Sequence, residues 1–233
     1  MKVKVIIFDL DDTLYNEIEY VYSGFKAVAN YFANLKNIND EQFYTEMVYN
    51  LRKDGRGKIF DKVLKKYNIY SKKNIKKSIS IYRNHQPNIF LSDENIEILK
   101  YFNNKKIPLY IITDGNKIVQ EKKIKKLGLE QYIKKNLITH RYGKKNSKPS
   151  TYCFEKVAKI EKVQYSDIVY VGDNINKDFI NIKKIGFKTI RVLNGMFKNE
   201  IKKECYHAQL DIESLKELKN IINNPVKNSL SES

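Results

Sequence analysis

Three short clusters of polar residues could carry the chemistry of this chain, and each directly follows a run of apolar residues. The first cluster contains Asp9 and Asp11, the second contains Asp114, and the third contains Asp173 and Asp178. Ligands of open parallel sheets bind just beyond the carboxyl ends of the strands. If the apolar runs are neighbouring parallel strands, the acids of all three clusters meet at one place in the fold.

Carboxylates that meet at one place repel one another, and some of them would have to take up protons. A divalent cation removes this conflict, and Mg²⁺ prefers a few carboxylates together with water and a substrate phosphate. Lys148, directly before Pro149, would add positive charge on the phosphate side. Asp12, Asp173 or Asn174 could instead simply cap a helix. Three clusters after three apolar runs favour a functional site over caps.

The apolar runs themselves have the composition of buried parallel strands, which are covered on both faces and therefore lack polar alternation. They span residues 3–8, 109–112, 168–171 and 189–192, with a weaker candidate at 137–139. Three apolar stripes at helical spacing separate the later runs. The stripes consist of Ile124 and Leu127, of Phe154, Val157 and Ala158, and of Ile175, Phe179 and Ile182. This alternation predicts an α/β fold with a doubly wound parallel sheet.

The stretch at 15–88 breaks this rhythm, because it contains helical patterns and no strand pattern of comparable quality. Its clearest stripe is formed by Val21, Phe25, Val28, Phe32 and Leu35. We therefore expect a catalytic core at 1–14 and 89–223, a helical insert at 15–88, and a flexible tail at 224–233.

Composition argues against several classes of protein. Hydrophobic residues make up 42% of the chain, enough for a packed core. The net charge of +17 suggests nucleic acid, but it comes almost entirely from dispersed lysines, so we expect no nucleic acid as main partner. No apolar stretch approaches a membrane span and the N-terminus lacks a signal peptide's apolar core. Cys153 and Cys205 form neither a metal spacing nor a disulfide framework. We expect a cytoplasmic protein with no membrane partner.

Four motifs occur in a fixed order along the chain. They are Phe8-Asp9-Leu10-Asp11-Asp12-Thr13-Leu14-Tyr15, Ile112-Thr113-Asp114-Gly115, Lys148-Pro149, and Val171-Gly172-Asp173 with Asp178. Each motif is weak alone, but together they are specific, and in this order the sequence resembles the haloacid dehalogenase-like superfamily of hydrolases. One departure is Asp12, which stands where many members have glycine.

The resemblance implies a Rossmann-like core with a small α-helical cap after the first motif, and it implies three catalytic roles. Asp9 would be the nucleophile that attacks phosphorus and forms an aspartyl phosphate. Asp11 would protonate the leaving oxygen and later deprotonate the attacking water. Lys148 would offset the negative charge of the phosphate.

The remaining roles that the resemblance implies concern the phosphate and the metal ion. Groups expected to hold phosphate oxygens are Thr113 and the backbone N–H groups of Asp114 and Gly115. Groups expected to bind Mg²⁺ are the Asp9 carboxylate, the Asp11 backbone carbonyl and Asp173. Asp178 and Asn174 are expected just outside these ligands, with Asp178 orienting Lys148 or a metal-bound water.

The function implied is hydrolysis of a small phosphorylated metabolite, a sugar phosphate or a nucleotide, by a monomer or homodimer. Asp11 favours phosphate over a carbon–halogen bond, because the namesake 2-haloacid dehalogenases lack an acid two residues after the nucleophile. A phosphomutase would share every core residue. The alternative that is not an enzyme is a binding module on the same scaffold.

A basic loop at 52–58 is the candidate for recognising the leaving group. It contains Arg52 and Arg56 together with two glycines, and loops on rigid scaffolds often carry specificity. We expect Arg56, and secondarily Arg52, to bind the leaving group through charge-assisted hydrogen bonds. A solvated basic turn is the alternative.

Overall fold

The computed structural model describes residues 1–36 and 38–223, so the predicted tail at 224–233 lies outside the described residues. The chain divides into two compact units. One consists of Met1–Glu17 and the chain from Phe90 onward, and the other is Ile18–Ile89. That the second unit caps an active site stays a prediction.

The first unit is built on a six-stranded parallel sheet with the order β3-β2-β1-β4-β5-β6. Its strands are β1 (Val5–Phe8), β2 (Leu109–Thr113), β3 (Lys135–Ile138), β4 (Ile168–Gly172), β5 (Lys188–Val192) and β6 (Leu210–Ile212). The direction of winding reverses between β1 and β4, as in Rossmann-type sheets. The predicted α/β class with a doubly wound parallel sheet is therefore confirmed.

Burial explains why the central strands read as continuous apolar runs. Every residue of β1, β2 and β4 is buried, because helices cover both faces of the sheet. Phe8 pairs with Ile111 on one side and with Val171 on the other. This register brings the carboxyl ends of the three strands level, so the polar clusters that follow them lie at the same edge.

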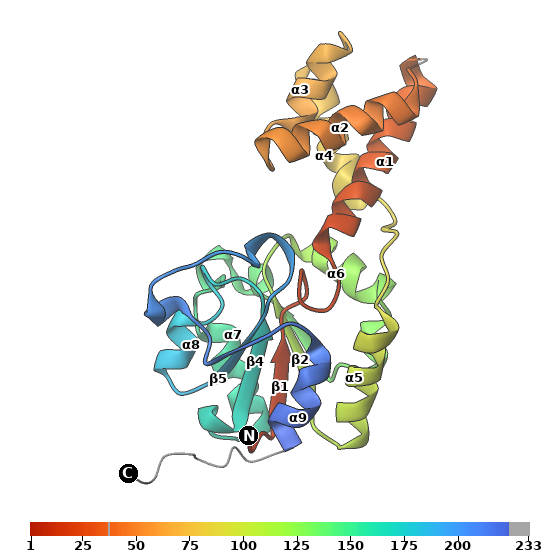
Figure 1. Cartoon of the computed structure of the whole chain (residues 1–233). Coiled ribbons are helices and arrows are strands. Elements are labelled where there is room, and N and C mark those ends of the chain that lie inside the picture. The colour runs from red at the N-terminus through yellow and green to blue at the C-terminus, as the bar shows by residue number, and fades with distance from the viewer. Residues whose placement is uncertain (37, 224–233) are drawn as a thin grey trace. The chain divides into compact units, whose positions relative to one another are not determined.

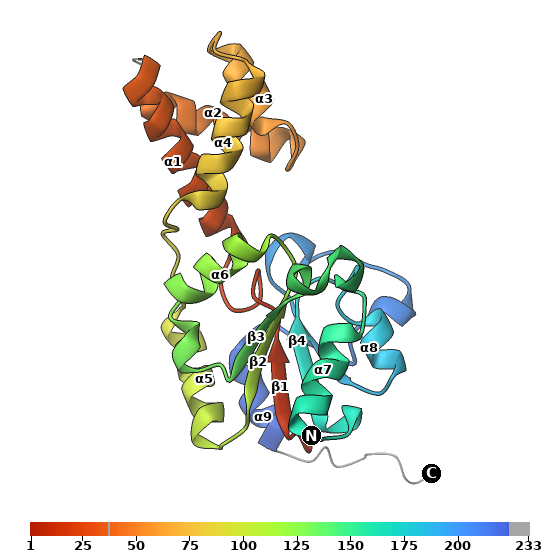
Figure 2. The same ribbon diagram turned by 180° about the vertical axis from the view of Figure 1, so that it is seen from behind.

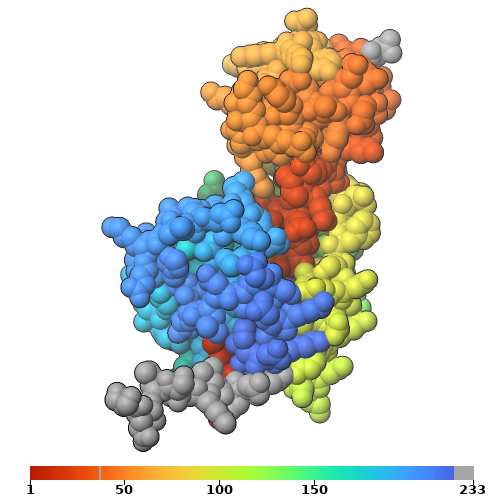
Figure 3. Space-filling view, in the orientation of Figure 1, coloured from red at the N-terminus to blue at the C-terminus, as the bar shows by residue number. Residues whose placement is uncertain are grey.

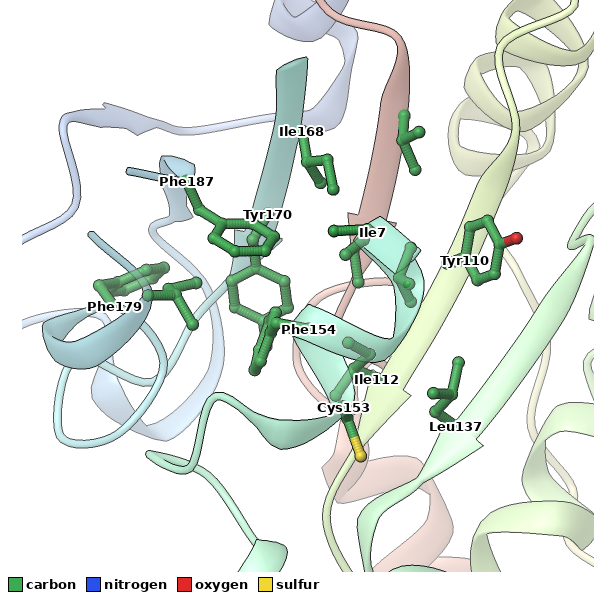
Figure 4. Close-up of a cluster of buried hydrophobic side chains, with 14 residues drawn as sticks. Ile7, Tyr110, Ile112, Leu137, Cys153, Phe154, Ile168, Tyr170, Phe179 and Phe187 are labelled. Carbon is green, nitrogen blue, oxygen red and sulfur yellow. The ribbon is translucent and has the colours of Figure 1, made fainter. Parts of the chain in front are cut away.

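Helices lie on both faces of the sheet (Figures 1 and 2). The α-helices of this unit are α5 (Asp93–Asn104), α6 (Lys117–Lys126), α7 (Tyr152–Glu161), α8 (Ile180–Lys184) and α9 (Leu218–Asn223). Short 3₁₀ turns are η1 (Leu129–Gln131), η2 (Thr139–Tyr142), η3 (Lys144–Asn146), η4 (Tyr165–Asp167), η5 (Gly195–Phe197), η6 (Glu204–Tyr206) and η7 (Leu215–Glu217). The face that α7 covers forms one core cluster, in which Phe154 and Val157 pack against Ile7 and Tyr170 (Figure 4). Residues beyond β5, in the blue part of the colour scale, form a broad part of the surface (Figure 3).

The helix predicted from Ile175 begins five residues later, at Ile180. Side chains compete for the backbone here: the Asn174 side chain accepts from the N–H of Asn176 at 3.0 Å, and the Asp178 carboxylate accepts from the N–H of Asn174 at 3.0 Å. Ile175 is buried as expected, but in a turn. The apolar spacing identified the buried side chains correctly and gave the wrong start for the helix.

The second unit contains most of α1 (Glu17–Lys36), together with α2 (Asp40–Asp54), α3 (Ile59–Lys66) and α4 (Lys72–Asn84). The predicted stripe from Val21 to Phe32 forms its core with residues of α2 and α3. Leu35 is 55% exposed, so the buried stripe ends one turn earlier than predicted. Within residues 1–36 and 38–223 no helix is both long and apolar enough to cross a membrane.

Gly24 is the residue of α1 at which close packing excludes a side chain. A Cβ atom there would lie 2.5 Å from Cδ2 of Tyr82, whose ring also packs against Tyr20, Phe25 and Phe60. Because the Tyr82 ring is held on several sides, it cannot move away cheaply.

We expect Gly24→Ala to lower the free energy of unfolding by about 1–3 kcal/mol, the usual cost of overpacking, although alanine favours helix. Urea unfolding followed by circular dichroism measures this. Gly57→Ala is the matched control, because a Cβ there meets nothing within 4 Å. Equal stability of the two variants would contradict the packing argument.

Candidate active site

Three buried carboxylates meet at the carboxyl ends of β1 and β4. Asp9, Asp173 and Asp178 each place one oxygen so that all three lie within 4.8 Å of one another. Asp9 is fixed by its backbone, because its N–H donates to the carbonyl of Val171 at 2.8 Å. β1 and β4 are distant in the chain but are neighbours in the sheet, and their pairing therefore brings the first and fourth motifs together.

Lys148 neutralises part of this negative charge. Its Nζ lies 2.8 Å from Oδ2 of Asp9 and 2.8 Å from Oδ1 of Asp178, and its side chain is fully buried. Burial alone would lower the pKa of Lys148, but the charges of Asp178 and Asp9 outweigh it and raise the pKa well above its ordinary value. Lys148 is therefore a fixed cation between two of the three acids.

One ammonium does not compensate three carboxylates, and the pKa values of Asp9 and Asp173 are raised as a result. Burial, followed by the charges of Asp178 and Asp9, raises the pKa of Asp173 to about 9. Burial also raises the pKa of Asp9 to about 6, although Lys148 acts in the opposite direction. A dry cluster of oxygen ligands with too little positive charge suits a hard divalent cation. The residues present therefore fit a metal site.

Asp178 belongs to this carboxylate cluster and contacts Lys148, in agreement with the expectation that it orients this lysine. Its place just outside the metal ligands stays a prediction. Asn174 stays beside the cluster, since its backbone N–H donates to Asp178 and its side chain closes the local turn. The prediction for Asp11 concerned its backbone carbonyl, and it stays a prediction.

The Asp11 carboxylate lies in a separate network. It accepts from Tyr15 Oη at 2.6 Å, from Gln120 Nε2 at 2.8 Å and from Lys123 Nζ at 2.7 Å. Burial would raise the pKa of Asp11, but the charge of Lys123 and these hydrogen bonds outweigh it and hold the pKa below its usual range. Two carboxylates only two residues apart therefore have opposite environments.

The second motif lies at the end of β2 beside this network. The Thr113 hydroxyl accepts from Gln120 Nε2 at 2.7 Å, so one side-chain amide contacts both Thr113 and Asp11. Asp114 accepts from Thr139 at 2.7 Å and from the N–H of Lys148 at 3.1 Å. Gly115 has a φ of 131°, a conformation that side chains disfavour.

Sequence reasoning missed several residues whose side chains contact predicted site residues. They include Tyr15, Gln120, Lys123, Thr139, Tyr170 and Lys177, the last with its Nζ 3.1 Å from Oδ2 of Asp114. Gln120 and Lys123 lie at helical spacing on the buried side of α6, beside Ile124, so this spacing could have revealed them. The Lys177 contact has no comparable signal in the sequence.

The backbone conformation of Asp12 shows why glycine is common at this position of the first motif and how aspartate is accommodated here. Its φ is 55°, the left-handed region that glycine adopts readily and aspartate tolerates better than most residues. Its carboxylate accepts from the N–H of Glu17 at 2.8 Å, which ties the turn to the start of α1.

The two arginines of the predicted loop belong to the helical unit. Arg52 lies in the last turn of α2, and Arg56 follows in the segment before α3. Both are exposed, and every other predicted site residue belongs to the first unit.

The profile of the family described as haloacid dehalogenase-like hydrolase matches residues 6–192 and so spans all four motifs. The chain belongs to the haloacid dehalogenase-like hydrolases. A glyceraldehyde 3-phosphate phosphatase of Methanocaldococcus jannaschii is 30% identical over 227 residues, which are 95% of this chain and 98% of the relative. Another from Pyrococcus abyssi is 27% identical, over 95% of this chain and 94% of the relative.

Solved structures of this family share the fold. The magnesium-bound crystal structure of a hydrolase of the haloacid dehalogenase type from Bacillus subtilis has a TM-score of 0.67 at 18% identity, covering 96% of this chain and 100% of that one. The predictions of the family and of the Rossmann-like core are both confirmed.

The raised pKa of Asp173 predicts that divalent cations bind to this haloacid dehalogenase-like hydrolase more tightly as the pH rises. A ligand carboxyl must be ionised, so binding near neutral pH displaces its proton, and this cost disappears as the pH approaches about 9. Thermal unfolding at increasing Mg²⁺ concentrations, repeated across this pH range, gives the affinity. Asp173→Asn should remove most of the Mg²⁺ effect. A Mg²⁺ affinity that is independent of pH would contradict the proton displacement.

Proposed function

We propose that this chain is a Mg²⁺-dependent phosphomonoester hydrolase that works through an aspartyl phosphate on Asp9. The observation that carries the proposal is the buried cluster in which Lys148 lies 2.8 Å from Asp9, with Asp173 and Asp178 beside them. This cluster combines a nucleophilic carboxylate with cationic groups that can screen its approach to an anionic phosphate.

In the first step an oxygen of Asp9 attacks phosphorus, and the bond between phosphorus and the ester oxygen breaks. Asp11 supplies the proton that the leaving oxygen takes. In the second step water attacks the same phosphorus, Asp11 accepts a proton from that water, and the bond from Asp9 to phosphorus breaks. Inorganic phosphate leaves and both carboxyls return to their starting state.

The contacts of Asp11 suit the second of these steps. Lys123 and Gln120 hold Asp11 ionised, which is the form that takes a proton from water. To donate a proton in the first step, Asp11 must first take up a proton from solvent, which weakens its contact with Lys123, and then give that proton to the leaving oxygen. A leaving group that needs no proton makes this proton uptake unnecessary.

The phosphate would be held at the end of β2, close to the carboxylate cluster. Gln120 donates to the oxygen of Thr113, which orients the Thr113 hydroxyl so that its proton can be given to a phosphate oxygen. The backbone N–H groups of Asp114 and Gly115 follow directly, and the left-handed turn at Gly115 supports this use.

Mg²⁺ would be held by Asp9 and Asp173, with the backbone carbonyl of Asp11 and with Asp178 close to the ion. When bound, it supplies positive charge that polarises the phosphoryl group and neutralises the approaching carboxylate. Asn174 would support Asp178 through its backbone N–H.

The substrate would be a small phosphorylated metabolite. The curated relatives named above are phosphatases of glyceraldehyde 3-phosphate. We propose a phosphate ester of this size for the present chain, hydrolysed in the cytoplasm by a monomer or homodimer.

The helical unit would act as the cap, and Arg56, with Arg52, would bind the leaving group. Arg56 borders a pocket of about 320 Å³ in that unit, whose other walls include Phe25, Phe60 and Tyr82.

The decisive experiment compares wild type with Asp9→Asn on an aryl phosphate in the presence of Mg²⁺. We expect the variant to lose several orders of magnitude in kcat and to keep its Tm, because only the nucleophile changes. Asp211→Asn, at an exposed aspartate of β6, is the matched control and should keep full activity. Beryllofluoride, which mimics an acyl phosphate, should bind wild type alone. Equal binding to both, or full activity in excess EDTA, would refute the proposal.

The proposed role of Arg56 predicts different effects of its substitution on two substrates. Arg56→Ala should raise KM for glyceraldehyde 3-phosphate by about tenfold, the loss typical of one charge-assisted hydrogen bond, and leave kcat unchanged. A small aryl phosphate, which has no group for this arginine, should be unaffected. Arg83→Ala, an exposed arginine of α4 that does not border the pocket, should behave as wild type. Equal losses on both substrates would contradict a role confined to the leaving group.

A further inference from the structure

The side chain of Tyr170 is a buried group whose hydroxyl no motif accounts for. It lies in the middle of β4, three residues before Asp173, and its ring packs edge-on against Phe154 with the ring centroids 4.9 Å apart (Figure 4). Packing in the apolar core requires only the ring of this side chain. The hydroxyl forms hydrogen bonds of its own: it accepts from Lys148 Nζ at 2.9 Å and donates to Oδ1 of Asp178 at 3.2 Å.

This hydroxyl completes the surroundings of the lysine. An ammonium group has three N–H donors and no acceptor. Lys148 has three oxygen partners within 2.9 Å: Asp9, Asp178 and Tyr170. With three partners in fixed directions the ammonium cannot rotate, and its position between Asp9 and Asp178 is determined.

We propose that Tyr170 is a positioning residue for the phosphoryl transfer: its hydroxyl fixes the Lys148 ammonium at the distance from Asp9 at which it screens the attack. The proposal rests on the phosphohydrolase function above. Tyr170 itself contacts neither Asp9 nor the phosphate. Its hydroxyl bonds to Lys148 and to Asp178, and its effect on the reaction comes through the position of the Lys148 ammonium. Misplacing a charged group by about 1 Å in a preorganised site costs about a hundredfold in rate.

The chain offers a matched pair of variants. Tyr170→Phe removes one oxygen and keeps the ring that packs against Phe154. Tyr110→Phe makes the same change on β2, in the same core cluster (Figure 4). There the hydroxyl donates to Glu161 and does not contact Lys148. We expect Tyr170→Phe to lower kcat for an aryl phosphate by about 10- to 100-fold with little change in KM. Tyr110→Phe should retain wild-type kcat.

A double-mutant cycle shows whether Tyr170 acts through the lysine. Losses at residues that act as one unit do not multiply. Adding Tyr170→Phe to Lys148→Met should therefore cause no further loss, and the Mg²⁺ concentration for half-maximal activity should be the same in wild type and Tyr170→Phe. Multiplying losses, a higher Mg²⁺ requirement, or a kcat equal to that of Tyr110→Phe would each overturn the proposal.

A spectroscopic measurement tests the positioning independently of any catalytic function. Lys123 and Lys148 are the two buried lysines among the residues that the structure describes, so both ammonium groups should give protected ¹H–¹⁵N signals. Tyr170→Phe should broaden or abolish the Lys148 signal and preserve that of Lys123. Two unchanged signals would refute the positioning role even if the enzyme is a phosphatase. Loss of the Lys148 signal in a protein without phosphatase activity would instead refute the proposed function alone.

Discussion

The structure of the site depends on one constraint, that carboxylates can be buried together only where positive charge or bound protons compensate them. Asp9, Asp173 and Asp178 come from two strand ends and the turn beyond, and Lys148 comes from the loop that precedes α7. The ammonium therefore joins three segments that are distant in the chain. Because it compensates only part of the charge, the cluster fits a divalent cation, and the proposed phosphate site lies beside it.

The same constraint places two neighbouring acids in different electrostatic environments. Asp9 faces the carboxylate cluster, where burial raises its pKa, and Asp11 faces α6, where Lys123 lowers its pKa. Enzymes that need one carboxyl as nucleophile and another for proton transfer often separate them in this way. Here the separation comes from the turn after β1, in which Asp12 adopts a left-handed conformation.

Much of this arrangement was predictable from the sequence, because buried parallel strands and their polar ends have a direct signature. The strands that carry Asp9, Asp114 and Asp173 were found within two residues of their observed bounds. β6 was missed, since Leu210–Ile212 is a short edge strand that is mostly exposed and has no apolar run. Tyr170 looked like one more apolar strand residue, and Lys123 looked like one of many lysines. Which atoms these side chains contact is decided by tertiary packing, which spacing alone does not give.

The sheet order also affects how the chain folds during synthesis. Among the six strands of the sheet β1 comes first in chain order, and Ile6 pairs with Leu109 and with Val169, both far along the chain. Contacts between distant residues form slowly, because a long loop must close before they are gained. Until β4 and the turn beyond it have been synthesised, Asp9 has neither Asp173 nor Asp178 beside it. Asp9, the proposed nucleophile, thus precedes Asp173 and Asp178 by most of the core in chain order, so the proposed site can form only after most of the core has been made.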